Sequence, residues 1–214
     1  MTSNFYLLLA LVLAISYVLG RYHARYRTAT FQNRGEALVS LAIQSNFKSP
    51  DYHLLNHITL KLKDGTTQID HILVSRFGVF VIETKDYSGW IFANAKQPTW
   101  TQVLFRKKFK FKNPIFQNIR HVEAVRNALD FLPPSSIKSL VVFTGKAKFK
   151  TEVPPEVFTI SQLIEHLRSH RDESISLNRL HFCVGRLEAT RLAITGETDL
   201  AHVKNLERRH SGRN

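Results

Sequence analysis

The stretch from Gln68 to Lys85 constrains the fold of this chain more than any other segment. Two runs rich in Ile, Val and Phe, Gln68–Val74 and Val79–Lys85, flank Gly78. They predict two β-strands joined by a tight turn. Charged residues interrupt these otherwise apolar strands at the end away from the turn: Asp70, Glu83 and Lys85.

The pairing register of this hairpin decides which charged groups meet, because side chains alternate between the two faces of a strand. A two-residue loop formed by Phe77-Gly78 would set Asp70 opposite Lys85, whereas a four-residue loop would set Asp70 opposite Glu83. Both registers place the three charged groups on one face, which Asp70 shares with Ile72 and Val74. We therefore expect two carboxylates and an ammonium group to meet at one end of an apolar sheet.

This cluster of charges has two interpretations. It can be a cross-strand salt bridge at a sheet edge, which contributes little when it is exposed. It can also be a metal site, because two convergent carboxylates supply hard oxygen ligands for Mg²⁺ and a nearby lysine can orient or activate a water. Residues elsewhere in the chain must decide between them.

Composition limits the class of protein. The chain has 214 residues, 43% of them hydrophobic, which allows one sizeable domain with appendages and excludes wholesale disorder. A formal net charge of +13 points to an anionic partner, either nucleic acid or a membrane surface. Cys183 is the only cysteine, which excludes an intrachain disulfide and a cysteine zinc cluster; it lies in an apolar helical stretch and is expected in the core.

The N-terminus predicts a membrane anchor. Residues 1–20 include no charged side chain, and Arg21, Arg25 and Arg27 follow at once. A cleaved signal peptide has the reverse order of charge, so we favour an uncleaved single spanning helix over residues 5–20 rather than a signal peptide or a buried helix. The positive-inside rule then predicts insertion in the inner (cytoplasmic) membrane, with the N-terminus outside and the body in the cytoplasm.

The segments beside the hairpin predict a mixed sheet with helices packed on it. Thr28–Phe47 is expected to be a helix with an apolar face that includes Leu38, Leu41 and Ala42. Glu36 lies on a neighbouring stripe of the same predicted helix with Val39, and most residues of this stripe are apolar. His53–Leu62 alternates as a strand does.

A basic segment follows the hairpin and two further expected strands, Trp90–Ala93 and Trp100–Phe105. Between Asp86 and Glu123 the sequence has no acidic residue. Basic residues alternating with phenylalanines suit a groove that follows a phosphate backbone. They also suit a solvated edge strand with Phe109 and Phe111 on its buried face. The basic residues are Arg106, Lys107, Lys108, Lys110 and Lys112.

The rest of the chain predicts alternating helices and strands. Asn113-Pro114 begins a helix that extends to about Phe131. Its expected apolar side consists of Ile115, Ile119, Val122 and Leu129. Strands are expected at Ser139–Phe143 and Val157–Ile160, and helices from Ser161, as cap, to His170, at Leu177–Leu192 and at Thr198–Arg209. We divide the chain into an anchor (1–27), a core (28–145), a C-terminal completion (146–196) and a basic tail (197–214).

A series of short motifs from about Arg34 to Leu129 resembles the nuclease-related domain (NERD) family. The motifs are Gly35-Glu36, Gln68-Ile69-Asp70-His71, Val81-Ile82-Glu83-Thr84-Lys85, Tyr87-Ser88-Gly89-Trp90-Ile91, Trp100-Thr101-Gln102 and Asn113-Pro114-Ile115-Phe116-Gln117-Asn118 with His121. This family is similar to the PD-(D/E)XK nucleases. The resemblance implies an α/β (α+β) fold with a restriction-endonuclease-like core, in which a mixed central sheet is flanked by helices.

The resemblance also implies a site. Asp70, Glu83 and Glu36 would be carboxylates around Mg²⁺ (or Mn²⁺), Lys85 would activate or orient the water, and Gln117 would assist. The expected function is a membrane-anchored nuclease that hydrolyses DNA or RNA at the cytoplasmic face. A non-catalytic nucleic-acid-binding module and a basic scaffold at the membrane surface are the alternatives.

Overall fold

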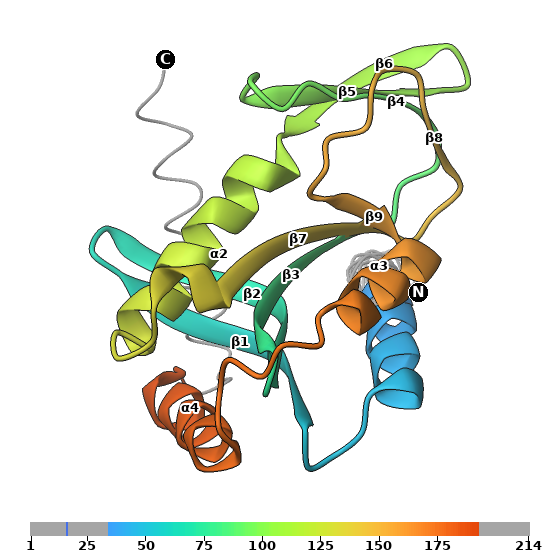
Figure 1. The fold of residues 1–214 in the computed structure, drawn as a ribbon. Coiled ribbons are helices and arrows are strands. Elements are labelled where there is room, and N and C mark those ends of the chain that lie inside the picture. The colour runs from blue at the N-terminus through green and yellow to red at the C-terminus, as the bar shows by residue number, and fades with distance from the viewer. Residues whose placement is uncertain (1–15, 17–33, 193–214) are drawn as a thin grey trace, which may run out of the picture.

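A five-stranded mixed sheet forms the centre of the protein (Figure 1). The computed structural model describes Ser16 and residues 34–192. Strand β2 pairs antiparallel with both β1 and β3, whereas β7 and β9 continue the sheet in parallel from β3. The expected mixed sheet is thereby confirmed. In spatial order its strands are β1 (Tyr52–Leu62), β2 (Gly65–Ser75), β3 (Gly78–Lys85), β7 (Ile137–Phe143) and β9 (Val157–Thr159).

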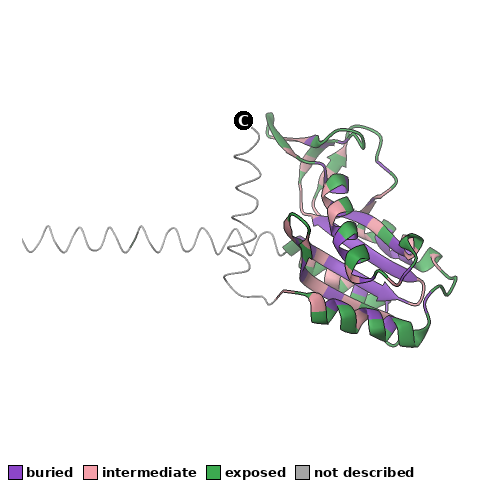
Figure 2. Cartoon of the chain, turned by 90° about the vertical axis from the view of Figure 1, so that its left-hand side faces the viewer, coloured by how far each residue is buried: buried purple, intermediate pink, exposed green. Residues whose placement is uncertain are grey.

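Helices cover both faces of this sheet. One face packs on α2 (Pro114–Ala128) and α4 (Leu177–Thr190), and the other packs on a helix over residues 34–46 and on α3 (Ile160–Ser169). In Figure 2 the buried residues concentrate in the sheet between these helices. The α+β class with flanking helices is therefore confirmed.

A second, four-stranded sheet stands beside the first, where the sequence predicted a single sheet. Its order is β6 (Lys107–Lys112), β5 (Thr99–Leu104), β4 (Gly89–Phe92) and β8 (Ala147–Phe149). Ile91 and Trp100 pack its inner face against Val141 and Phe143 of β7. The chain turns into this sheet at Gly89, whose φ of 84° favours glycine and where a Cβ would lie 2.4 Å from the Val103 carbonyl oxygen.

The buried face of the helix over 34–46 differs from the predicted one. Leu38 is 40% exposed and Leu41 is 62% exposed, whereas Val39, Ile43 and Phe47 are buried. These three residues recur every four positions and form one continuous stripe toward the sheet. The stripe is the one on which the sequence placed Glu36, so the helix turns that carboxylate toward the sheet.

The buried face of α2 also differs, because it is partly polar. Ile119 was expected inside but is 54% exposed, and Asn118 and His121 are buried instead. The Asn118 amide nitrogen donates to the carbonyl oxygens of Val81 at 2.9 Å and Leu140 at 3.0 Å. One side chain of α2 thus binds the backbones of two adjacent strands, β3 and β7.

Strand β9 and helices α3 and α4 lie where the sequence predicted them, with one correction, whereas β8 was not predicted. Thr159, not Ser161, caps α3, because the hydroxyl of Thr159 and the side chain of Gln162 form a reciprocal capping box. Cys183 is fully buried on α4 as predicted, and burial raises the pKa of its thiol to about 11.

Two predicted elements lie outside the described residues: the spanning helix over residues 5–20 (apart from Ser16) and the helix Thr198–Arg209. No helix within residues 34–192 combines the length and apolar character that a membrane crossing requires. The anchor therefore stays a prediction from the sequence.

We predict that Asn118→Ala lowers the free energy of unfolding by about 2–3 kcal/mol. The substitution leaves buried carbonyl groups of β3 and β7 without their donor. Urea unfolding followed by tryptophan fluorescence measures the loss. Asn127→Ala is the matched control, because Asn127 is exposed on the same helix and its loss should change stability by no more than about 0.5 kcal/mol. Equal effects of the two substitutions would contradict the role of Asn118.

Candidate active site

The central hairpin adopts the register that sets Asp70 opposite Glu83. The pairs Ser75 with Gly78 and His71 with Ile82 define this register, and its continuation brings the two carboxylates together. Pairing between β2 and β3 stops after His71, although both strands extend further. Instead, Asp70 Oδ2 accepts a hydrogen bond of 2.7 Å from the Thr84 amide. The carboxylate thus lies where the two strands separate.

Asp70 does not share the face of Ile72 and Val74 in the simple way that alternation predicts. Ile69 and Ile72 both pack in the core under α2 and α4, so the alternation of β2 shifts by one residue between them. Opposite this shift, His57 on β1 has a φ of 52°, a left-handed conformation that interrupts the β1–β2 ladder. The local change in β1 and β2 alters the direction of the side chains near His57 and Asp70. A periodic sequence pattern does not predict such a change.

Lys85 joins the hairpin to α2. Its ammonium group forms a salt bridge with Glu83 and donates a hydrogen bond of 3.1 Å to the Gln117 side-chain oxygen. Gln117 lies in the first turn of α2, which begins where Asn113 caps the Ile115 amide. The structure therefore brings together three predicted site residues from two elements.

His121 is a residue of this cluster to which the sequence assigned no role. It is buried one helical turn after Gln117, and its Nε2 lies 2.9 Å from Glu83 Oε2. An ionised Glu83 can only accept, so Nε2 donates to it, and Nδ1 lies 2.7 Å from the Thr67 hydroxyl oxygen. The spacing of Gln117 and His121 by four residues in a predicted helix is the signal that could have found it.

Glu36 reaches this region because its helix packs closely against the end of β3. Gly35 permits the approach, since a Cβ there would lie 2.6 Å from Thr144 Oγ1 and 2.8 Å from Asp86 Cβ. Glu36 Oε2 lies 3.2 Å from Nδ1 of His57, the residue with the left-handed backbone. No sequence pattern predicted that His57 would be the partner of Glu36.

A partly buried group of polar side chains joins this helix to the sheet. Asn56 Oδ1 accepts from the Ser40 hydroxyl at 3.1 Å and lies 2.8 Å from His71 Nδ1. Burial, and then nearby His57, lower the pKa of His71 to about 4, so its ring is neutral at physiological pH. Ser40, Asn56 and His71 therefore join the helix to β1 and β2 one turn beyond Glu36.

The carboxylates of the cluster have different electrostatic environments. Burial raises the pKa of Asp70 well above its ordinary value, and the charges of Glu83 and Glu36 raise it further. Burial and then Glu83 also raise the pKa of Glu36, although His57 opposes them. Burial alone would raise the pKa of Glu83, but Lys85 and His121 lower it below its ordinary value.

Lys85 is held as an ammonium ion. Burial alone would lower the pKa of Lys85, but Glu83 and Asp70 raise it above its ordinary value. In this arrangement Lys85 has protons to donate to Glu83 and Gln117, and no lone pair with which to accept one. Its geometry favours orientation of a water over removal of a proton from it.

The donor set fits a hard divalent cation in its chemistry. Asp70, Glu83 and Glu36 offer carboxylate oxygens and interact unfavourably with one another, a repulsion that a cation between them relieves. Within residues 34–192, however, no group of three or more His, Cys, Asp and Glu side chains has the geometry of a complete metal site. A cation therefore stays a prediction here.

The predicted basic segment forms the hairpin edge of the second sheet. Arg106 occupies the turn with a φ of 67°, and β6 is an edge strand as the second interpretation required. Phe111 packs on Trp100 and Tyr87, but Phe109, expected on a buried face, is 48% exposed. The basic residues themselves are all exposed: Arg106, Lys107, Lys108, Lys110 and Lys112.

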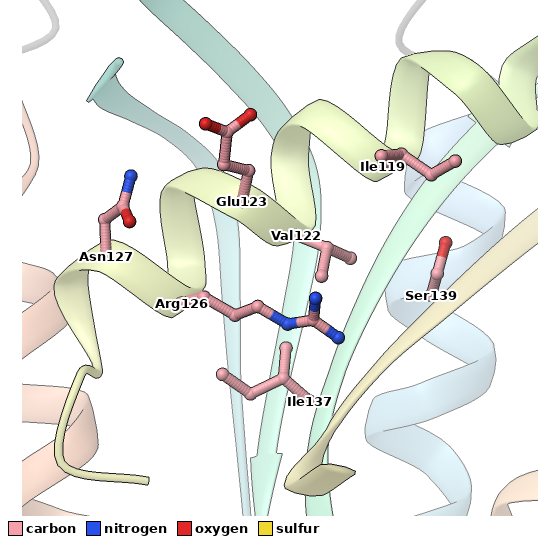
Figure 3. A pocket seen from close by; sticks show the side chains of 7 residues that line it. All are labelled: Ile119, Val122, Glu123, Arg126, Asn127, Ile137 and Ser139. Carbon is pink, nitrogen blue, oxygen red and sulfur yellow. The ribbon is translucent and has the colours of Figure 1, made fainter. Parts of the chain in front are cut away.

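A groove of about 420 Å³ lies between α2 and the start of β7 (Figure 3). In Figure 3, Val122 and Arg126 of α2 extend toward Ile137 of β7. Its lining contains none of the predicted site residues.

A mixed α+β core that gathers carboxylates, a lysine and a glutamine where two strands separate is the arrangement expected of a nuclease-related protein. The model of the family described as "Nuclease-related domain" matches residues 32–144. The chain therefore belongs to the nuclease-related domain family, as its motifs predicted. An uncharacterized protein of Bacillus anthracis is 40% identical over 117 residues, which is 54% of this chain and 54% of that protein. The chain thus spans about half the length of this relative. No solved structure matches this chain.

We predict that Gly35→Ala lowers the free energy of unfolding by about 1–3 kcal/mol, because the new methyl group forces the helix away from Thr144 and Asp86. Chemical denaturation of the two proteins measures the difference. Gly185→Ala is the matched control: no atom lies within 4 Å of the new Cβ on α4, so the alanine should stabilise the helix by up to about 1 kcal/mol. A stabilising Gly35→Ala would show that the close approach is not required.

Proposed function

We propose that this chain is a divalent-metal-dependent nuclease that hydrolyses phosphodiester bonds of DNA or RNA. The observation that carries the proposal is the contact of Lys85 with both Glu83 and Gln117 beside Asp70. The alternative, a salt bridge at an exposed sheet edge, would not involve a residue of α2. Here Gln117 of α2 takes part, and Glu83 is almost entirely buried. The family assignment supports the same chemistry.

Each residue of the cluster has a distinct task in this proposal. Asp70, Glu83 and Glu36 would hold Mg²⁺ or Mn²⁺, which neutralises phosphate charge and makes a bound water more acidic. Lys85 donates hydrogen bonds that orient the attacking water and the phosphate oxygens. Gln117 holds the Lys85 ammonium group in place, and His121 fixes the orientation of Glu83.

A non-catalytic nucleic-acid-binding module is the second candidate. The observation that favours it is that both Glu83 oxygens already have partners, Lys85 and His121. Three carboxylates near a phosphate would nevertheless repel it unless a cation lay between them. That cost favours the nuclease.

We also propose that residues 5–20 anchor the chain in the inner membrane, with the N-terminus outside and the nuclease-related domain in the cytoplasm. The support is the uncharged run followed by Arg21, Arg25 and Arg27. The nuclease would then act at the cytoplasmic face.

We predict that Asp70→Asn reduces metal-dependent cleavage of DNA or RNA by about 1000-fold or more, because a charged ligand of the cation is lost. Binding of nucleic acid should survive, since a repelling charge is removed as well. Lys85→Ala should also suppress turnover while sparing metal affinity. Cleavage of labelled single- and double-stranded substrates in Mg²⁺, Mn²⁺ and EDTA measures these effects.

Matched controls separate the site from general effects of charge. Asp130→Asn and Lys96→Ala change the same residue types at exposed positions and should leave cleavage unchanged. Wild-type protein that binds nucleic acid yet cleaves none with any divalent cation would reject the nuclease and support the binding module.

We predict that the full-length chain pellets with membranes and is not extracted by about 1 M salt. At this ionic strength charges are screened beyond about 3 Å, so attachment by surface charge alone would be lost. Removal of residues 1–27 should release the domain into the soluble fraction, because the apolar segment alone supplies insertion. Release of the intact chain by salt alone would show attachment through charge and not through a spanning helix.

A further inference from the structure

The outer face of the four-stranded sheet carries exposed aromatic side chains on a central strand. Strand β4 lies between β5 and β8, and its Trp90 and Phe92 are 50% and 39% exposed. Lysines commonly protect the edges of sheets, but β4 is not an edge. Edge protection therefore does not account for these two aromatic residues.

The strand register shows which residues share this face. Trp90 lies opposite Val103 and Lys148, and Val103 lies opposite Lys108. Directly paired residues point to the same side of a sheet, whereas the residues between them point to the other side. The outer face thus also receives Phe92, Thr101, Lys110 and Lys112, while Ile91, Trp100, Phe111 and Phe149 pack inward.

Lysines border the aromatic pair on both sides. Lys108 and Lys110 come from β6, and Lys148 comes from β8 on the opposite side. The Lys150 Nζ atom lies 4.6 Å from the centre of the Trp90 ring, so this cation is already placed beside the aromatic surface. The four strands contain no Asp or Glu. The face therefore suits an anion that also has flat apolar surfaces.

We propose that this surface, the lysine–aromatic face, binds single-stranded nucleic acid. It is defined by Trp90, Phe92, Lys108, Lys110, Lys148 and Lys150. Unpaired bases can stack on Trp90 and Phe92 while the lysines contact phosphates, and every base has a π-face, so the surface requires no particular sequence. A duplex hides its base faces, so the proposal assigns an unpaired strand to this surface. The inference rests on the proposed function, whose substrate it narrows to nucleic acid with a single-stranded segment.

The lysine–aromatic face is joined to the candidate active site by short connections. Four residues, 86–89, separate Lys85 from Trp90, so the two Cα atoms are at most about 18 Å apart. On the other side, β6 ends at Lys112 and α2, which carries Gln117, begins at Pro114. The face and the candidate active site are therefore a few nucleotides apart at most along the chain's own connections.

An anionic membrane surface is the competing occupant, because lysines and aromatic residues also suit lipid interfaces. A membrane would first take Phe105, which is 92% exposed at the β5–β6 turn. Trp90 and Phe92 lie within the sheet and are only half as exposed. A face with lysines on both sides of its aromatic residues matches a strand more closely than a lipid surface, and substitution of Phe105 distinguishes the two occupants in an experiment.

Binding measured in EDTA tests the proposal without any cleavage. The probes are a fluorescein-labelled 15-mer of thymidine and a 15-base-pair duplex, added to the full-length chain in non-ionic detergent. Trp90→Ala should weaken binding of the 15-mer by about tenfold or more, the factor that one stacked base supplies, and Trp90→Phe should restore most of it. Replacement of Lys148 and Lys150 by Gln should reduce the slope of log affinity against log salt by about 1.4.

Tryptophan fluorescence gives a direct readout of stacking. The 15-mer should quench Trp90, and the quenching should vanish in Trp90→Phe because Trp100 is buried. Phe182→Ala and Lys63→Gln, at exposed positions elsewhere, should change nothing. Vesicles with and without phosphatidylserine supply the competing arm: a blue shift of Trp90 emission on the anionic vesicles, lost in Phe105→Ala, would assign the face to lipid and overturn the proposal.

The remaining outcomes are also decisive. Unchanged 15-mer affinity in Trp90→Ala and Phe92→Ala would overturn the proposal, as would equal losses for 15-mer and duplex, or no binding of the 15-mer by wild-type protein. Absence of metal-dependent cleavage, with 15-mer binding intact and Trp90-dependent, would reject the nuclease but leave this face as a binding surface.

Discussion

The burial of Glu83 is the constraint on which the rest of the site depends. A carboxylate that is 2% exposed within an apolar strand is costly unless charged and hydrogen-bonding partners surround it. Lys85 from the same strand and His121 from α2 supply these partners. The contact between His121 and Glu83 positions α2 over β3. Gln117, on the same helix, then lies within hydrogen-bond distance of Lys85. The charge that makes this strand unusual thereby also determines which helix covers it.

Close backbone packing brings the second acidic element to the same place. Gly35 and the group formed by Ser40, Asn56 and His71 hold the helix over 34–46 against the sheet, and Glu36 follows as a consequence. Asp70 lies where β2 and β3 separate, and its carboxylate accepts a hydrogen bond from the Thr84 amide. Structural and chemical requirements therefore meet at one place: the groups that hold this end of the sheet together lie beside the carboxylates that we propose to bind the cation.

The positive charge of the protein is distributed unevenly around this site. The carboxylates gather at the end of the central sheet, whereas the strands of the second sheet contain lysines and no acidic residue. Such a separation lets one surface attract a polyanion while another holds a cation against it. The two surfaces belong to different sheets but are joined by short connections before β4 and after β6.

Local chemistry in the sequence determined the hairpin, the start of α2 at Asn113-Pro114, the helical position of Cys183 and the family. These features depend on alternation, capping and composition, which neighbouring residues specify by themselves. The sequence could not determine that the chain forms two sheets, that Ile119 is exposed, or that Val39 and not Leu38 faces the core. Nor could it show that His57 and His121 contact the acidic residues. These outcomes depend on contacts between residues far apart in the chain, such as the 38 positions between Glu83 and His121. Only the tertiary structure selects among the faces and registers that local periodicity leaves equivalent, because the buried charge of Glu83 needs a distant partner, His121, as well as its neighbour Lys85.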